Sequence, residues 1–204
     1  MKRALLLTAL AFAASSAGAD AHFVLVSPAA SLEQNKLGDP QKIAPCGGVS
    51  ANPARGTPPD PGVPTRAVTE LKGGSTFRLV VNETIYHPGH YRVALARTAA
   101  GLPPDPVATT TETPKGRRSA SAEIAKTPVP PVLLDGLFPH AERPTANWET
   151  DVAIPNVDCK DCVLQVIQFM VDHPGNREGG FSYYHCATVN ITADASKPLD
   201  TRWK

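Results

Sequence analysis

Apolar and polar residues alternate along several short segments of this chain, which is the period of a β-strand and not of a helix. No long segment has a convincing helical period. Because turn residues separate the alternating segments, the pattern predicts an all-β fold, an antiparallel β-sandwich with long loops. We expect strands at residues 23–26, 68–71, 76–82, 91–96, 148–154, 162–171 and 181–192, and a short helix or turn at 132–139.

The connections between these strands are long and carry most of the 21 prolines. Residues 45–66, rich in Pro and Gly, are predicted to be an irregular loop, and residues 97–131 a Pro-rich insertion loop. Residues 196–204 are expected to form a loose C-terminal tail. The sequence thus predicts one immunoglobulin/fibronectin-like sandwich domain over residues 22–195.

The first 21 residues have the pattern of a signal peptide. Lys2 and Arg3 precede an apolar stretch at residues 4–14 that is too short to span a bilayer, and Ala19-Asp20-Ala21 is a cleavage-site triplet. Cleavage after Ala21 predicts a secreted or periplasmic protein whose first residue is His22. No later segment is long and apolar enough to be a membrane span.

The charge balance argues against strongly charged partners, which are bound mainly by electrostatic attraction. The chain has 20 Lys and Arg and 19 Asp and Glu, a net charge of +1, which gives no footprint for nucleic acid or an anionic membrane. We expect a monomer. No nucleophile elbow, Walker loop, dinucleotide fingerprint or His-Glu-x-x-His motif is present.

The chain has four cysteines, which in an oxidising compartment favour two disulfides. Four cysteines allow three connectivities, and the sequence does not choose among them. Cys159–Cys162 would close a tight local loop and leave Cys46–Cys186 to close a long one. A redox or zinc role for the Cys-x-x-Cys is the alternative, although no second such motif supports it.

His22 is the residue that carries the strongest chemical hypothesis. At a free amino terminus, a histidine offers two nitrogen donors, its α-amine and a ring nitrogen. Together they chelate a metal that prefers nitrogen in a planar arrangement, which points to copper. The hypothesis requires a second imidazole within reach. His87 and His90 offer one, because His87-Pro-Gly-His is predicted to form a turn between two strands at one end of the sandwich.

The closing strand contains Tyr183-Tyr-His-Cys, in which Tyr183 and His185 share one face and Tyr184 and Cys186 the other. If Cys186 points into the core, Tyr183 and His185 point toward solvent or a site. Core aromatic residues with one exposed histidine are the plainer interpretation. Asp172-His173 in the preceding loop is a further candidate pair for a metal. His140, near prolines, is expected to have no functional role.

These motifs resemble those of lytic polysaccharide monooxygenases and, more closely, a bacterial group of monooxygenase-like exported proteins. The resemblance rests on an amino-terminal His22 after cleavage, His87-Pro-Gly-His-Tyr-Arg-Val, Cys162-Val-Leu-Gln-Val-Ile-Gln and Tyr183-Tyr-His-Cys-Ala-Thr-Val-Asn-Ile. The chain is also similar to fungal copper-acquisition proteins of the same architecture, including Pro45-Cys-Gly-Gly. The likeness does not cover the Pro-rich insertion.

The resemblance implies a β-sandwich with a copper site called a histidine brace. His22 would bind copper through its amine and ring and His87 through its ring, with His90 in reserve. Tyr183 would take the axial position, and His185 the place where the monooxygenases often keep a Gln or Glu beside bound oxygen species. Asp172 is the candidate for the Asp of the copper-acquisition proteins. The resemblance also favours the Cys46–Cys186 pairing.

The function implied is copper-dependent oxidative cleavage of a polysaccharide such as chitin or cellulose, driven by an external reductant. The alternatives are a non-catalytic copper-binding protein with a copper-transfer partner, and a glycan-binding module without a metal. Glycans are usually bound by exposed aromatic residues, and Tyr86, Tyr91 and Trp148 are the candidates here. The chain is only 6% aromatic, which weakens the case for a crystalline substrate.

Overall fold

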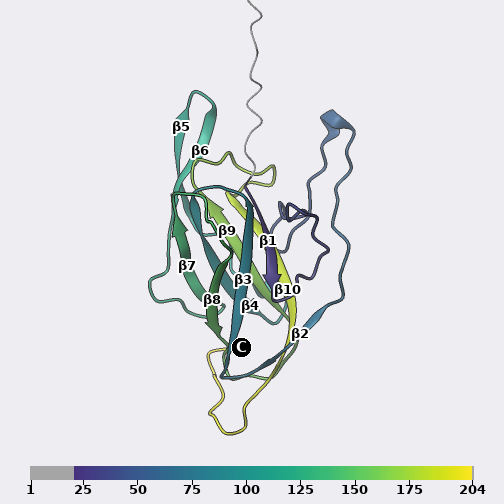
Figure 1. The fold of residues 1–204 in the computed structure, drawn as a ribbon, viewed down its shortest axis with the longest axis vertical. Coiled ribbons are helices and arrows are strands. Elements are labelled where there is room, and N and C mark those ends of the chain that lie inside the picture. The colour runs from purple at the N-terminus through teal and green to yellow at the C-terminus, as the bar shows by residue number, and fades with distance from the viewer. Residues whose placement is uncertain (1–20, 204) are drawn as a thin grey trace, which may run out of the picture.

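The structure, a computed structural model, describes residues 21–203 and is nearly all β (Figure 1), as the alternating pattern predicts. The predicted signal peptide therefore lies, except for Ala21, outside the described residues. Two short 3-10 helices, η1 (Pro53–Arg55) and η2 (Ala99–Gly101), lie in loops. The described strands are β1 (His22–Ser27), β2 (Val68–Lys72), β3 (Thr76–Ile85), β4 (Gly89–Ala96), β5 (Ala108–Thr113), β6 (Gly116–Ala122), β7 (Val132–His140), β8 (Trp148–Ala153), β9 (Cys159–Met170) and β10 (Ser182–Thr192).

Two sheets pack face to face to form the sandwich. The smaller has the order β1-β3-β8, and the larger has the order β2-β10-β9-β4-β7. All pairings within them are antiparallel except that of β2 with β10, which is parallel. Alternate residues of the facing strands fill the space between the sheets, among them Phe23, Leu79, Val93 and Val166, each completely buried. Burial of this apolar surface is the main source of stability.

The chain between β4 and β8 departs from the sequence prediction in two places. Residues 97–131 are not merely an insertion loop, because β5 and β6 pair there as an antiparallel hairpin with Thr113 at one end of the turn. Residues 132–139 form β7 and not a helix or turn. β7 has no burial alternation, since nearly all of its residues are half-buried, so the pattern in the sequence was too weak to indicate a strand.

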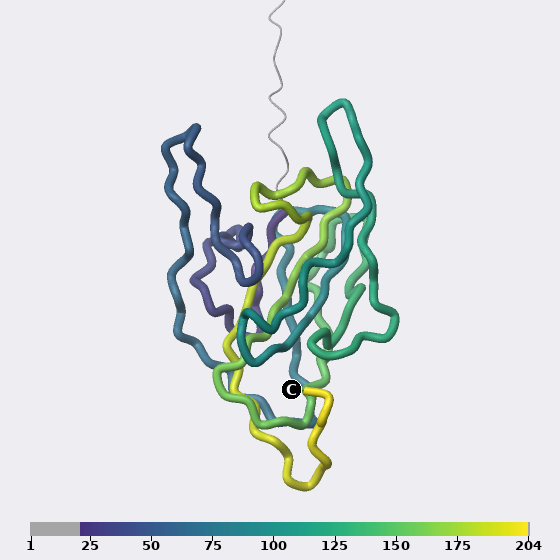
Figure 2. The backbone as a smooth tube through the Cα atoms, turned by 180° about the vertical axis from the view of Figure 1, so that it is seen from behind, coloured from purple at the N-terminus to yellow at the C-terminus, as the bar shows by residue number. Residues whose placement is uncertain are grey.

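The C-terminal segment is docked and not loose. The side-chain amide of Asn156 donates hydrogen bonds to three carbonyl oxygens of the segment, those of Asp194, Lys197 and Pro198, at 3.0–3.1 Å. Trp203 packs against the core. The predicted tail therefore covers the end of the sandwich opposite β5 and β6 (Figure 2).

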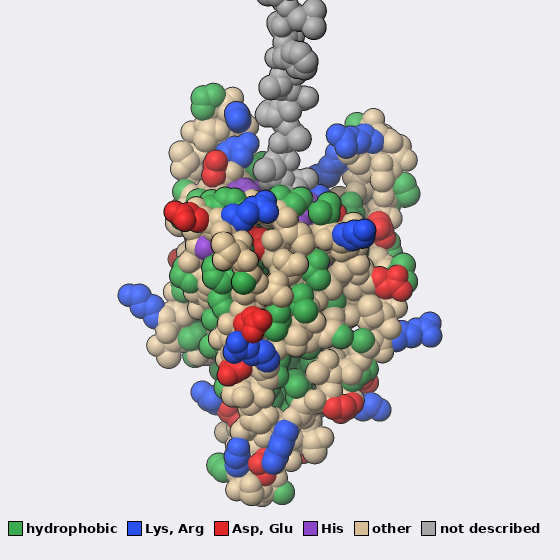
Figure 3. All heavy atoms as spheres, in the orientation of Figure 1, with side chains coloured by type: hydrophobic (Ala, Val, Ile, Leu, Met, Phe, Trp, Pro, Cys, Tyr) green, Lys and Arg blue, Asp and Glu red, His purple; other side chains and the backbone are tan. Residues whose placement is uncertain are grey.

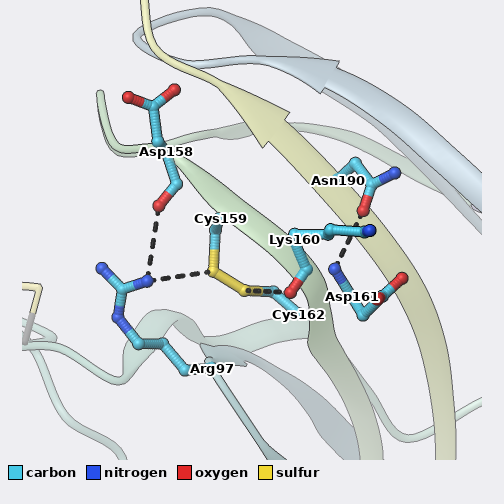
Figure 4. Close-up of a disulfide and its surroundings, with 7 residues drawn as sticks. All are labelled: Arg97, Asp158, Cys159, Lys160, Asp161, Cys162 and Asn190. Carbon is cyan, nitrogen blue, oxygen red and sulfur yellow. Dashed lines mark hydrogen bonds between the residues drawn. A yellow bond between two sulfur atoms is a disulfide. The ribbon is translucent and has the colours of Figure 1, made fainter.

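Two disulfides are present, and they join the pairs that the resemblance and the local spacing favoured. Cys46–Cys186 links the loop after β1 to β10 across a sequence separation of 140 residues. Cys159–Cys162 closes the start of β9, beside Arg97, whose guanidinium donates to the Asp158 carbonyl and to the Cys159 sulfur (Figure 4). The described residues contain no free cysteine.

Two segments project from the same end of the sandwich. One is the hairpin of β5 and β6. The other is residues 49–60, called the arm here, whose two sides are held by bridges between Val49 and Asp60 and between Asn52 and Thr57. Figures 1 and 2 show β1 beginning between these two projections. No helix among residues 21–203 is long and apolar enough to cross a membrane.

Candidate metal centre

His22 is the first residue of β1 and pairs with Ile85 near the end of β3. This register places His22 beside the β3–β4 turn, at the end of the sandwich from which the hairpin and the arm project. The side chain is buried, and its Nε2 lies 3.2 Å from Oδ2 of Asp39. Because an ionised carboxylate only accepts hydrogen bonds, Nε2 is the donor in this contact.

Asp39 reaches His22 because the preceding glycine packs tightly against β1. A Cβ on Gly38, whose φ is +102°, would lie only 1.9 Å from the Phe23 carbonyl oxygen, so no larger residue fits. The Asn35 side chain accepts hydrogen bonds from the backbone N–H of Leu37, Gly38 and Asp39 and closes this turn. Burial by itself raises the pKa of Asp39, but the hydrogen bond from His22 and the charge of Lys42 outweigh burial and lower it.

His87 lies in the turn between β3 and β4, where the sequence predicted it. The turn is tight because a Cβ on Gly89 would lie 1.9 Å from the Phe169 carbonyl oxygen. The ring of His87 is buried, and its Nδ1 has no hydrogen-bond partner among the described residues. Burial lowers the pKa of His87 despite opposing effects of the Pro88 carbonyl and Asp172. The ring is therefore neutral at neutral pH, as metal binding requires.

Glu83 fixes the backbone of the His87 turn. Its buried carboxylate accepts the backbone N–H of His87 at 2.9 Å and the side-chain N–H groups of Gln168 at 3.0 Å and Trp148 at 3.3 Å. His140 lies 3.1 Å from the same carboxylate and donates to the His87 carbonyl at 2.9 Å. His140, expected to have no role, therefore orients this turn together with Glu83.

Glu83 and His140 form a charged pair in the interior. Burial by itself raises the pKa of Glu83, but the hydrogen bonds from His140 and the His87 backbone outweigh it and lower the pKa. Burial lowers the pKa of His140, and the hydrogen bond to Glu83 more than compensates and raises it. A buried pair of this kind is stable only when its remaining hydrogen bonds are made, as they are here.

Four rings form a continuous series of contacts at this end of the molecule. The ring of Tyr183 lies edge-on to His22, with 5.6 Å between centroids, and edge-on to His173, also at 5.6 Å. His173 lies edge-on to His87 at 5.1 Å. The tertiary structure therefore brings together His22, His87, His173 and Tyr183, which come from β1, the β3–β4 turn, the β9–β10 loop and β10.

His185 lies in the interior and not in a solvent-facing or open site. Tyr183 and His185 do share one face of β10, but that face is the core face, and Tyr184 and Cys186 are on the outer one under the loop that contains Cys46. The Nε2 of His185 donates to the Phe23 carbonyl at 3.0 Å, and the two rings pack at 4.8 Å. Its visible role is to support β1 directly behind His22.

His90 and Asp172 are not part of this series of ring contacts. His90 is buried on β4, where its ring packs against Phe169 at 5.2 Å. The Asp172 carboxylate is 76% exposed and lies 3.8 Å from the Arg118 guanidinium. The acidic group that contacts His22 is thus Asp39, which the sequence did not single out because it is 17 residues away in an irregular loop.

The donors fit copper only if the backbone contributes. Among residues 21–203, no group of three His, Cys, Asp or Glu side chains is placed to hold a metal ion. The rings of His22 and His87 are nitrogen ligands that suit copper. The α-nitrogen of His22 lies in a peptide bond with Ala21 here, and cleavage of that bond would convert it into the amine donor that a three-nitrogen site needs.

No protein-family model matches the chain, and no curated protein matches it.

Proposed function

We propose that the processed protein, beginning at His22, binds one copper ion through a histidine brace and uses it for oxidative cleavage of polysaccharide. The observation that carries the proposal is the contact of His22 Nε2 with Asp39 at 3.2 Å. The contact engages Nε2, and Nδ1 is the ring nitrogen that can chelate a metal together with the α-amine of the same residue. Nδ1 and the α-amine of one histidine close a six-membered chelate ring with a metal ion, and a carboxylate on the outer ring nitrogen is typical of metal-bound histidine.

His87 supplies the third nitrogen in this proposal. The Glu83 carboxylate and His140 hold its backbone on both sides, through its N–H and its carbonyl group. A ligand fixed in this way loses little conformational freedom on binding. Tyr183, in edge contact with His22, would lie beside the bound ion.

Bound copper would supply one-electron chemistry with oxygen, driven by an external reductant. The chain's own residues would hold the ion rigidly, keep the His87 ring neutral and exclude water from the buried sides of both rings. His185 is less suited to the role that the resemblance implies for it, because its ring packs behind β1 against Phe23. That role stays unassigned to any residue of the chain.

A copper-binding or copper-transfer role without oxidation is the second candidate. It is favoured by the hairpin and the arm, which project on both sides of the end where β1 begins (Figure 1). Such an end is poorly shaped to lie flat on a polymer surface. A copper-transfer partner could still reach the ion between the two projections.

The proposal is tested by copper titration and electron paramagnetic resonance on protein that begins at His22. His87→Ala should change the spectrum to one with fewer nitrogen ligands and weaken binding by more than the about 10- to 100-fold typical of losing an outer hydrogen-bond partner. His90→Ala is the matched control, since His90 is a buried histidine three residues along, and it should leave the spectrum unchanged. Protein that retains Ala21 should lose the brace signature.

The two candidate functions are then separated by products. Copper-loaded protein with ascorbate should release oxidised oligosaccharides detectable by mass spectrometry. A brace signature without oxidised products from any glycan would favour copper transfer. A spectrum that is the same in wild type, His87→Ala and the form retaining Ala21 would contradict both.

A further inference from the structure

A pocket of about 420 Å³ opens between the arm and the loop that precedes β10. Tyr183 and His173, two of the four rings of the candidate metal centre, are among the residues that line it. The pocket therefore adjoins the place where the proposed copper ion would sit. Its size is in the range of small-ligand sites in proteins.

The pocket has an excess of positive charge that the molecule as a whole lacks. Lys42, Arg55 and Arg177 line it, against the single acidic residue Glu178. The whole chain has a net charge of only +1, so the excess is local. Figure 3 shows Lys and Arg side chains on both projections at this end of the molecule.

The two arginines differ in how firmly their side chains are held. Arg177 donates to the Ala51 carbonyl at 2.5 Å and to the Asn52 side chain at 3.0 Å, which ties the loop to the arm and fixes the guanidinium. A guanidinium has five N–H donors, so the remaining ones are available to a ligand. The Arg55 side chain is exposed at the end of η1 and makes no hydrogen bond or ion pair with the rest of residues 21–203.

We propose that this pocket binds a carboxylate-bearing sugar unit, so that the glycan acted on is acidic, a uronic-acid polysaccharide. Arginine pairs with carboxylates through two parallel hydrogen bonds, a geometry that neutral sugars do not offer. Asn52, Ser50 and Thr57 in the same wall provide polar groups for sugar hydroxyls. As a statement about substrate, this inference rests on the proposed function; the binding preference itself does not require copper.

The test compares oligogalacturonate with a neutral cello-oligosaccharide of equal length, by calorimetry on protein that begins at His22, with and without copper. The acidic oligomer should bind at least about tenfold more tightly at low salt, because one hydrogen bond to a charged group corresponds to about a tenfold change or more. The preference should shrink at high salt. Equal affinity for the two oligomers would overturn the inference.

Arg55→Gln should reduce the affinity for the acidic oligomer about tenfold and leave that for the neutral one unchanged. Arg55→Lys should retain part of the preference. Arg97→Gln is the matched control, since Arg97 lies beside Cys159 at the other end of β4 (Figure 4), and it should have no effect. An unchanged affinity in Arg55→Gln, or equally tight binding of a polyglutamate peptide, would contradict an acidic-glycan site.

The electron paramagnetic resonance of the same samples separates the two proposals. If the brace signature is present but the acidic preference is absent, the inference about the glycan is wrong and the copper proposal stands. If the acidic preference is present without a brace signature, the copper proposal is wrong and the pocket still binds acidic glycan.

Discussion

At the scale of single residues, β10 shows what a two-residue period decides and what it leaves open. The period placed Tyr183 and His185 on one face, and the structure agrees. It did not say which face is inside. Cys186 faces outward because its partner Cys46 lies in a loop that covers the outer side of the sheet. His185 consequently points into the core, where its Nε2 donates to the Phe23 carbonyl of β1.

The burial of His185 predicts a pH effect on stability. Burial lowers its pKa to about 4, against the opposing hydrogen bond with the Phe23 carbonyl. Between that value and the ordinary pKa near 6.5, the unfolded chain binds a proton that the native protein does not, so stability falls as the pH falls. In urea unfolding, the contribution of His185 to the free energy of unfolding should be about 2–3 kcal/mol smaller at pH 4.5 than at pH 7.

His185→Gln isolates this contribution from that of the other titrating groups. The variant should lose less stability than wild type between the same two pH values, whatever its absolute stability. Parallel pH profiles for the two proteins would mean that His185 is not neutral and buried in solution.

At the scale of elements, Glu83 connects much of the fold that surrounds His87. From β3 it accepts hydrogen bonds from the β3–β4 turn, β7, β8 and β9 through His87, His140, Trp148 and Gln168. The shape of the turn is therefore set by a carboxylate inside the sandwich and not by the turn residues alone.

Replacing this carboxylate should be costly. Glu83→Gln leaves the buried His140 without its charged partner and should lower the free energy of unfolding by about 3 kcal/mol. Glu149→Gln is the matched control, because Glu149 pairs with Arg78 on the exposed face of the same sheet and should change stability by less than about 1 kcal/mol. Chemical denaturation of both variants checks this, and equal losses would refute the role given to Glu83.

At the scale of the whole molecule, the hairpin and the arm decide what can approach the end where β1 begins. They project past that end on both sides (Figure 2). Two of the aromatic residues that could have formed a flat surface for glycan binding, Tyr91 and Trp148, are not free to do so. Tyr91 is completely buried, and Trp148 donates to Glu83 and stacks on Phe138. For the proposed activity, both observations favour a separate polysaccharide chain as substrate over the face of a crystal.

The proposed activity should therefore be at least about tenfold greater on soluble chains than on crystalline cellulose or chitin, since poor positioning of a substrate alone costs up to about a hundredfold. Release of oxidised products per unit of copper-loaded protein measures the ratio. A variant with the arm shortened between Val49 and Asp60 should have a smaller ratio of activity on soluble chains to activity on crystalline substrate. Equal rates of wild type on both kinds of substrate would contradict the inference from shape.

The sequence by itself determined the β class, most strand positions and the turn that carries His87, because these follow from local periodicity and from Pro and Gly. Only the tertiary structure decided which faces are buried, that Asp39 contacts His22, and that Glu83 and His140 hold the His87 turn. Those features depend on contacts between residues far apart in the chain, such as Glu83 and His140, whose sequence separation is 57. A local pattern does not encode contacts at that separation.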